Sequence, residues 1–271
     1  MSAARASRVG AVVFLSLLIF GVHVCFAGTA AEAYGPGWEG LPDWRGVWHL
    51  QGPLLFSGPQ GAVIAKGSGA AKAADHGVTP GSYFTGAPYK PEYRKLYEER
   101  VASALKQRAV KDPVDNCHSP HGMPRLMGAG PGALEFFVTP GRTWIIWDAL
   151  NQTRRIYTDG RGHPGEDQRW ARTMGHSIGH WEKQTLVVDT VMLMPGIYDR
   201  SEAPYSDRLH ITERISLTDA KTITDEMTLE DPVMFTQPWR LSRRFIKSDK
   251  QWENVRGTYC EYVDPQPIRA E

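Results

Sequence analysis

The chain has few cysteines, almost no excess charge and no second long apolar run. The last two shortages exclude classes of protein. Its 271 residues include 31 Lys and Arg against 30 Asp and Glu, a formal net charge of +1. A general nucleic-acid-binding protein carries a basic excess, so no nucleic-acid partner is expected. No segment after Phe26 is apolar enough to cross a membrane. The sequence also lacks a phosphate-binding loop, a dinucleotide fingerprint and a nucleophilic-serine elbow.

The one long apolar run stands at the N-terminus. Arg5 and Arg8 precede the run Val9–Phe26, and small residues follow it. A positive start, an apolar middle and a small-residue exit are typical of a secretory signal peptide, here residues 1–27, with cleavage at its end or after Ala31. The alternative is an uncleaved anchor, because the run approaches the roughly 20 residues that span a bilayer. The signal predicts a periplasmic or secreted protein.

Three cysteines are present, and Cys25 would leave with the signal. The remaining pair, Cys117 and Cys260, predicts a disulfide, because free thiols are disfavoured in an oxidising compartment. The alternative is a reactive thiol with a bystander. Cys117 stands next to His118 and near His121, but a disulfide would remove that nucleophile.

Two regions differ in amino-acid composition and periodicity, and they are expected to form one domain. Residues 28–110 are rich in Gly, Pro and Ala and predict an irregular region that contains one helix, Pro91–Ala109. This region also contains a short strand-like piece, Trp44–Leu50, and a long loop, Gly58–Gly86. Residues 111–271 are β in character, because short runs of β-branched and aromatic residues alternate with turn residues.

The β region predicts an antiparallel meander that closes into a lipocalin-like barrel or folds into a sandwich. Its connections are mostly short, and no helical segment stands between strands to support parallel units. The fold class is therefore mostly β, with one N-terminal helix. The expected strands are Leu134–Thr139, Thr143–Asp148, Thr153–Thr158, Ser177–Glu182, Thr185–Met192, Leu209–Leu217, Thr222–Leu229, Trp239–Lys247 and Gln251–Tyr259.

Three acidic residues fall on apolar faces of these strands. Glu213 alternates with Leu209, Ile211, Ile215 and Leu217, and Asp189 and Asp225 are placed likewise. A carboxylate on a buried face is costly unless it is paired or protonated, and such groups have raised pKa values that suit general acid or base chemistry. The structural alternative is a buried pair with an arginine such as Arg154, Arg155, Arg214, Arg243 or Arg244.

A polar turn follows the third of these strands. It places Tyr157, Asp159, Arg161 and His163 around the turn signal Asp159-Gly160. Tyr and His can transfer protons near neutral pH, and Arg can hold an anionic oxygen, so all four are candidate catalytic residues. The alternative is a hydrogen-bonded turn with no chemical role.

His176 and His210 complete the set of candidate catalytic residues, with Asp189 and Glu213. His176 and His180 share a strand face at a spacing of roughly 13 Å, too far for one metal ion. A divalent metal would need partners such as His163, His210 or Asp189, and no cofactor is otherwise evident. Candidate ligand-binding residues are Arg125, Trp181 and Trp239.

Several ordered motifs resemble a large group of exported bacterial proteins of unassigned function. The resemblance spans roughly Pro91 to Glu261, and it implies export and a common β fold but no catalytic residues. A Gly-Asp expected before the Thr-Leu-Val-Val motif is replaced by Lys183-Gln184, at a turn. The motifs are Gly122-Met123-Pro124-Arg125-Leu126-Met127, Arg154-Arg155-Ile156-Tyr157-Thr158-Asp159-Gly160-Arg161 with His163-Pro164, Gly175-His176-Ser177-Ile178-Gly179-His180-Trp181-Glu182 and Thr185-Leu186-Val187-Val188-Asp189-Thr190.

These observations lead to three hypotheses about function. The first is an exported isomerase, lyase or hydrolase that performs acid–base chemistry on a small apolar or aromatic molecule in a barrel cavity. The second is a ligand-binding barrel without catalysis, and the third is a structural component of the envelope. A cavity with His and carboxylates would favour the enzyme, an apolar cavity the carrier, and a filled core the structural protein.

Overall fold

The structure is a computed structural model, and it describes residues 37–51, 87–107, 122–127, 133–147, 152–198 and 203–249. Several sequence predictions fall outside these ranges. They are the signal peptide at residues 1–27, the disulfide between Cys117 and Cys260, the loop Gly58–Gly86 and the strand Gln251–Tyr259.

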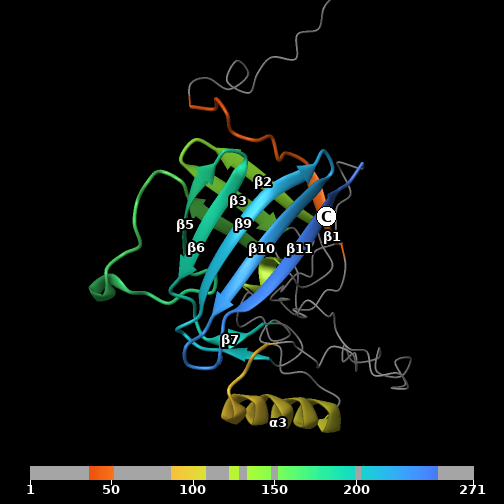
Figure 1. Cartoon of the computed structure of the whole chain (residues 1–271), viewed down its shortest axis with the longest axis vertical. Coiled ribbons are helices and arrows are strands. Elements are labelled where there is room, and N and C mark those ends of the chain that lie inside the picture. The colour runs from red at the N-terminus through yellow and green to blue at the C-terminus, as the bar shows by residue number, and fades with distance from the viewer. Residues whose placement is uncertain are drawn as a thin grey trace, which may run out of the picture.

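Nine strands form a closed barrel, one of the two forms that the sequence predicts (Figure 1). Every predicted strand within the described residues is a strand in the structure, and the piece Trp44–Leu50 supplies the strand that closes the barrel. The strands, in their order around the barrel, are β1 (Val47–Gln51), β11 (Trp239–Lys247), β10 (Thr222–Glu230), β9 (His210–Asp219), β6 (Thr185–Val191), β5 (His176–Glu182), β4 (Gln152–Tyr157), β3 (Arg142–Trp147) and β2 (Ala133–Thr139).

One strand pair departs from the predicted antiparallel meander. β4 and β5 run parallel, with Ile156 opposite Ser177 and Tyr157 opposite Ile178. A parallel pair needs a crossover instead of a tight hairpin. The crossover is the long segment between β4 and β5, which contains the 3-10 turn η6 (Glu166–Gln168) and extends away from the barrel in Figure 1. The expectation of a purely antiparallel barrel was therefore wrong at this pair.

Side chains alternate between the lumen and the outer face of the barrel, because successive residues of a strand point to opposite faces. In β9, for example, Ile211, Glu213 and Ile215 are buried, whereas Arg214 is exposed. The lumen is filled with apolar and aromatic side chains, including Trp48, Phe136, Ile145, Ile156 and Phe245. Burial of this apolar surface is the main force that stabilises the barrel.

Smaller elements pack at one end of the barrel. Helix α3 (Pro91–Gln107) agrees with the predicted helix, and Tyr97 is its buried contact with the core. The adjoining Tyr89 bridges to Phe235 and donates a hydrogen bond to the carbonyl of Pro204 in β8 (Pro204–Tyr205), which pairs with β7 (Gly196–Ile197). Among the described residues, no helix has the length and apolar character needed to cross a membrane.

Candidate functional site

The crossover between β4 and β5 brings His163 onto the outer face of the barrel. It begins after Tyr157 and returns at Gly175, whose φ of 64° lies in the left-handed region. A Cβ at Gly175 would lie 2.6 Å from the carbonyl oxygen of Val191, so the tight approach of β5 to β6 at this point requires glycine. His176 follows at once as the first residue of β5, within reach of His163.

Four candidate residues form a continuous hydrogen-bonded chain. His163 Nδ1 lies 2.8 Å from His176 Nδ1, and His163 Nε2 lies 2.9 Å from Asp189 Oδ1. The other carboxylate oxygen of Asp189 lies 3.0 Å from His210 Nε2. His210 Nδ1 lies 3.4 Å from Glu230 Oε2, a partner that the sequence analysis missed. We call His163, His176, Asp189 and His210 the histidine relay.

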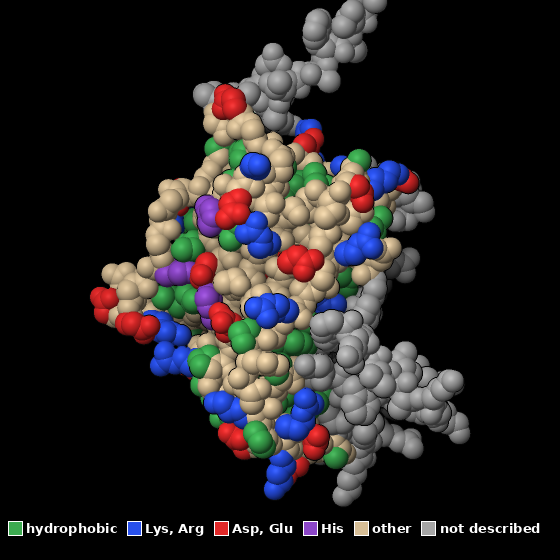
Figure 2. All heavy atoms as spheres, viewed as in Figure 1, with side chains coloured by type: hydrophobic (Ala, Val, Ile, Leu, Met, Phe, Trp, Pro, Cys, Tyr) green, Lys and Arg blue, Asp and Glu red, His purple; other side chains and the backbone are tan. Residues whose placement is uncertain are grey.

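The histidine relay lies on the outer face of the barrel. Figure 2 shows histidine side chains beside acidic ones on the face formed by β5, β6 and β9. The Asp189 side chain is 42% exposed and those of His163 and His210 are 21% and 33% exposed. The sequence placed Asp189 on an apolar face that would be buried. That face of β6 instead points outward, because Leu186, Val188 and Thr190 fill the lumen.

The environment drives the two terminal histidines toward opposite protonation states. Partial burial lowers the pKa of His176, and protonation of the neighbouring His163, together with the positive charges of Arg161 and Arg172, lowers it further. The hydrogen bond to Asp189 raises the pKa of His210, with help from Glu230. The hydrogen bond from His210 in turn lowers the pKa of Asp189, which is therefore ionised at neutral pH. Such divergent pairs are typical of an acid and a base that act together.

The tautomers follow from the partners. Ionised Asp189 can only accept, so His163 and His210 each donate from Nε2. In neutral His163, Nδ1 then carries a lone pair and accepts from Nδ1–H of His176. Neutral His176 is left with a bare Nε2. When that atom takes a proton, the Nδ1 proton can pass to His163, whose imidazolium Asp189 stabilises. The arrangement makes His176 Nε2 a proton acceptor.

The predicted polar turn lies next to His176. The Tyr157 ring stacks on the His176 ring, with centroids 5.5 Å apart, and the Arg161 guanidinium lies 4.0 Å from the Tyr157 centroid. Asp159 accepts from Arg161 Nε at 2.8 Å and holds that guanidinium in place. Arg155 donates to the Tyr157 hydroxyl at 3.2 Å, and this bond lowers the pKa of Tyr157. The turn therefore contributes a proton donor beside the acceptor.

Glu213 is separate from the histidine relay. It is fully buried in the lumen, where Arg154 Nη1 donates to Oε1 at 2.8 Å and Nη2 donates to Oε2. Arg154 also contacts Ser177 and Thr190. Among the two alternatives open from the sequence, the structure supports the buried arginine pair for this residue and not a catalytic role.

Asp225 lies beside this pair and is also fully buried. Burial raises its pKa well above the ordinary value, and the neighbouring Glu213 carboxylate raises it further. Between the ordinary carboxyl pKa of about 4 and its raised pKa in the folded state, Asp225 is therefore protonated in the folded protein and ionised in the unfolded chain. Because the folded state then binds one more proton, this residue makes the protein less stable as the pH rises.

We expect Asp225→Asn to remove this pH dependence, because an amide resembles the protonated acid. Chemical denaturation between pH 4 and 8 should show a decline in unfolding free energy that is shallower by up to about 1.4 kcal/mol per pH unit in the variant. Asp207→Asn, at an exposed position just before β9, is the control. An unchanged slope in Asp225→Asn would show that Asp225 is ionised in the folded protein.

The three predicted ligand-binding residues lie in different parts of the fold. Arg125 is buried in the 3-10 turn η4 (Arg125–Met127). Trp239 is buried against Tyr198 and Phe235, and Trp181 packs on Trp44 with centroids 5.3 Å apart. Trp239 belongs to the hydrophobic core, and Trp181 packs against it. In the ranges that the structure describes, no group of three or more His, Cys, Asp or Glu side chains is arranged to hold a metal ion.

Comparison with known proteins identifies no family for this chain. A scan against protein-family models finds no match to the chain, and a search of curated proteins finds no similar sequence.

Proposed function

We propose that this protein is an acid–base enzyme, an isomerase, lyase or hydrolase, that works at the histidine relay on the outer face of the barrel. The observation that supports it most is the chain of hydrogen bonds from His176 through His163 to Asp189 and on to His210. Its two ends are biased to opposite protonation states, so one can accept a proton while the other donates one.

In this proposal His176 Nε2 takes a proton from the substrate. His163 and Asp189 orient His176 and share the charge that develops on it, as the second and third members of a catalytic triad do. His210 holds a proton that it can return. Val191 lies on the outer face between His176 and His210. It pairs with His176, and its neighbour Thr190 pairs with Ile211, the residue after His210. Tyr157 and Arg161 would stabilise negative charge beside His176.

Deuterium exchange tests the proposal even while the substrate is unidentified. The protein is incubated in D₂O with a panel of small carbonyl compounds, hydroxy acids and amides, and mass spectrometry detects exchange, isomerisation, elimination or hydrolysis. We expect at least one compound to react with the wild type. Loss of this reaction in His176→Gln supports the proposal, and an equal reaction in that variant contradicts it.

A structural role in the cell envelope is the second candidate. The packed lumen favours it, because apolar side chains fill the barrel at the positions where a carrier would hold a ligand. This candidate predicts that no compound of the panel reacts, and that His176→Gln behaves like the wild type in every assay.

Export is part of the proposal and has its own test. The motivation is the positive N-terminus followed by the run Val9–Phe26. N-terminal sequencing of the full chain recovered from the periplasm or medium should give a start at Gly28 or Glu32. Recovery there with Met1 intact would contradict a cleaved signal.

A further inference from the structure

A groove of about 370 Å³ lies on the outer face of the barrel beside the histidine relay. This volume is within the range of small-ligand sites, roughly 300–1,000 Å³. The groove crosses β6, β9, β10 and β11, the strands that face the viewer in Figure 1. The outward side chains that line it are Val187, Thr212, Arg214, Glu226, Thr228 and Arg240.

Strand register places the groove next to the relay. Thr212 lies opposite Asp189 on one side and opposite Thr228 on the other. Thr228 in turn lies opposite Arg240. His210 stands two residues before Thr212 on the same face of β9. A molecule in the groove would therefore extend toward His210 and Asp189.

The groove offers polar groups that are not already engaged. Arg214 is held by Glu182 at 2.8 Å, and Glu226 accepts from Ser242 at 2.8 Å. In the part of the chain that the structure describes, the hydroxyls of Thr212 and Thr228 have no hydrogen-bond partner, and Arg240 has no acidic partner. Two hydroxyls and one guanidinium thus face a groove whose lining is otherwise mostly apolar and includes Val187. A guanidinium pairs best with a carboxylate, and hydroxyls pair with other hydroxyls.

We infer that this groove binds the substrate, and that the substrate is a small hydroxylated carboxylic acid. Its carboxylate pairs with Arg240, its hydroxyl groups bond to Thr212 and Thr228, and its far end reaches His210 and Asp189. This inference rests on the proposed function. It replaces the apolar or aromatic substrate that the sequence suggested, because the unengaged side-chain groups of the groove are a guanidinium and two hydroxyls, and the apolar lumen is filled.

Binding of matched probes tests the inference. Isothermal titration calorimetry of the full chain is performed with tartrate, gluconate and glucuronate. Sorbitol, which has a CH₂OH in place of the gluconate carboxylate, and hexanoate, which lacks the hydroxyls, are the comparisons. We expect at least one hydroxy acid to bind. Its uncharged or hydroxyl-free counterpart should have an affinity lower by about tenfold or more. Equal binding of gluconate and sorbitol, or no binding of any hydroxy acid, would overturn the inference.

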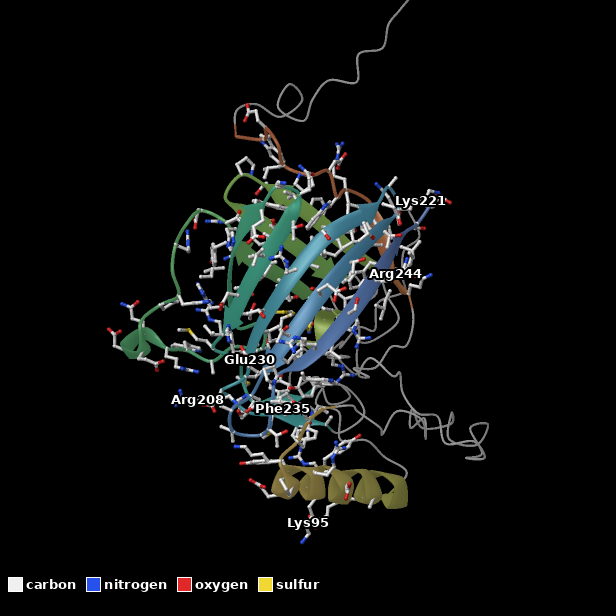
Figure 3. All side chains as sticks on the ribbon, in the orientation of Figure 1. Lys95, Arg208, Lys221, Glu230, Phe235 and Arg244 are labelled. Atoms are coloured by element: carbon white, nitrogen blue, oxygen red, sulfur yellow. The ribbon has the colours of Figure 1, made fainter. Side chains whose placement is uncertain are left out.

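Substitutions in the groove show where the hydroxy acid binds. Arg240→Gln should weaken binding of the hydroxy acid about tenfold or more, and Thr212→Val with Thr228→Val should weaken it further. Arg244→Gln is the matched control, because Arg244 is an exposed arginine on the same strand and face but outside the groove (Figure 3). If Arg240→Gln and Arg244→Gln lower the affinity for the hydroxy acid equally, the attraction comes from the overall positive charge of the strand. That result would contradict a specific binding site.

The same data separate this inference from the proposed function. Binding that depends on Arg240, with turnover unaffected by His176→Gln, would leave the groove as a ligand site and reject the acid–base enzyme. Turnover that depends on His176, on compounds that do not compete with any hydroxy acid, would keep the enzyme and reject the substrate class.

Discussion

Glu213→Gln is expected to lower the free energy of unfolding by about 3–5 kcal/mol, because it leaves the Arg154 guanidinium buried without its counter-charge. Both side chains are fully buried, and Arg154 makes two of its hydrogen bonds to this carboxylate. Chemical denaturation at pH 7 measures the loss. Glu226→Gln, which changes an exposed glutamate on the neighbouring strand β10, should cost less than about 0.5 kcal/mol.

A double variant shows whether the loss comes from the unpaired buried cation. Replacing both partners with apolar residues, Arg154→Met with Glu213→Leu, should recover much of the stability, because buried ion pairs are often neutral or worse relative to apolar groups of similar size. If Glu213→Gln unfolds like the wild type, Arg154 is not paired with Glu213 in solution, and Glu213 returns to the set of catalytic candidates.

His176→Gln is expected to reduce turnover by roughly 100-fold or more, the usual scale for loss of a general base, with little change in stability. The side chain is only half-buried on the outer face, so no core packing is lost. His180→Gln is the matched control. His180 lies on the same strand and face, but its partner is the exposed Glu182, outside the relay. Similar losses in both variants would contradict a specific role for His176.

Asp189→Asn extends this test to a positioning residue. An amide can donate as well as accept, so it no longer requires both histidines to donate from Nε2. The loss of turnover should therefore be accompanied by a change in the pH profile, because His210 loses the charge that raises its pKa. Asp189 is partly exposed, and a melting temperature close to that of the wild type is expected. A large drop in melting temperature with an unchanged pH profile would assign Asp189 a structural role.

The sequence was sufficient to predict the strands, and a barrel or a sandwich made from them, because strand periodicity is a local property. Alternation in β9 and β10 and the turn residues between them reveal the strands directly. It was not sufficient to decide which face of β6 points inward, because both faces are largely apolar. Leu186 and Val188 are buried, while Val187 and Val191 lie on the outer face with Asp189. The direction of such a strand is fixed by its neighbours in the barrel.

The sequence supplied the candidate residues, and the structure shows which of them lie in contact. Tyr157, His163, His176, Asp189 and His210 were all candidates, because the sequence shows which residues can transfer protons. Their contact depends on the parallel pairing of β4 and β5 and on the crossover that it requires, and no local pattern reveals that pairing. Glu230 was missed for a similar reason, since only the register of β10 against β9 places it opposite His210.

The protonation states of the relay histidines can be measured directly by ¹⁵N NMR of the histidine side chains. A pH titration of the full chain reports the tautomer and the pKa of each imidazole. We predict that His176 is neutral at pH 7, with hydrogen on Nδ1 and a bare Nε2, and titrates below the ordinary histidine pKa of about 6.5. His210 should remain an imidazolium above that pKa. The relay would be contradicted if His176 carried its hydrogen on Nε2, or if His176 and His210 titrated together.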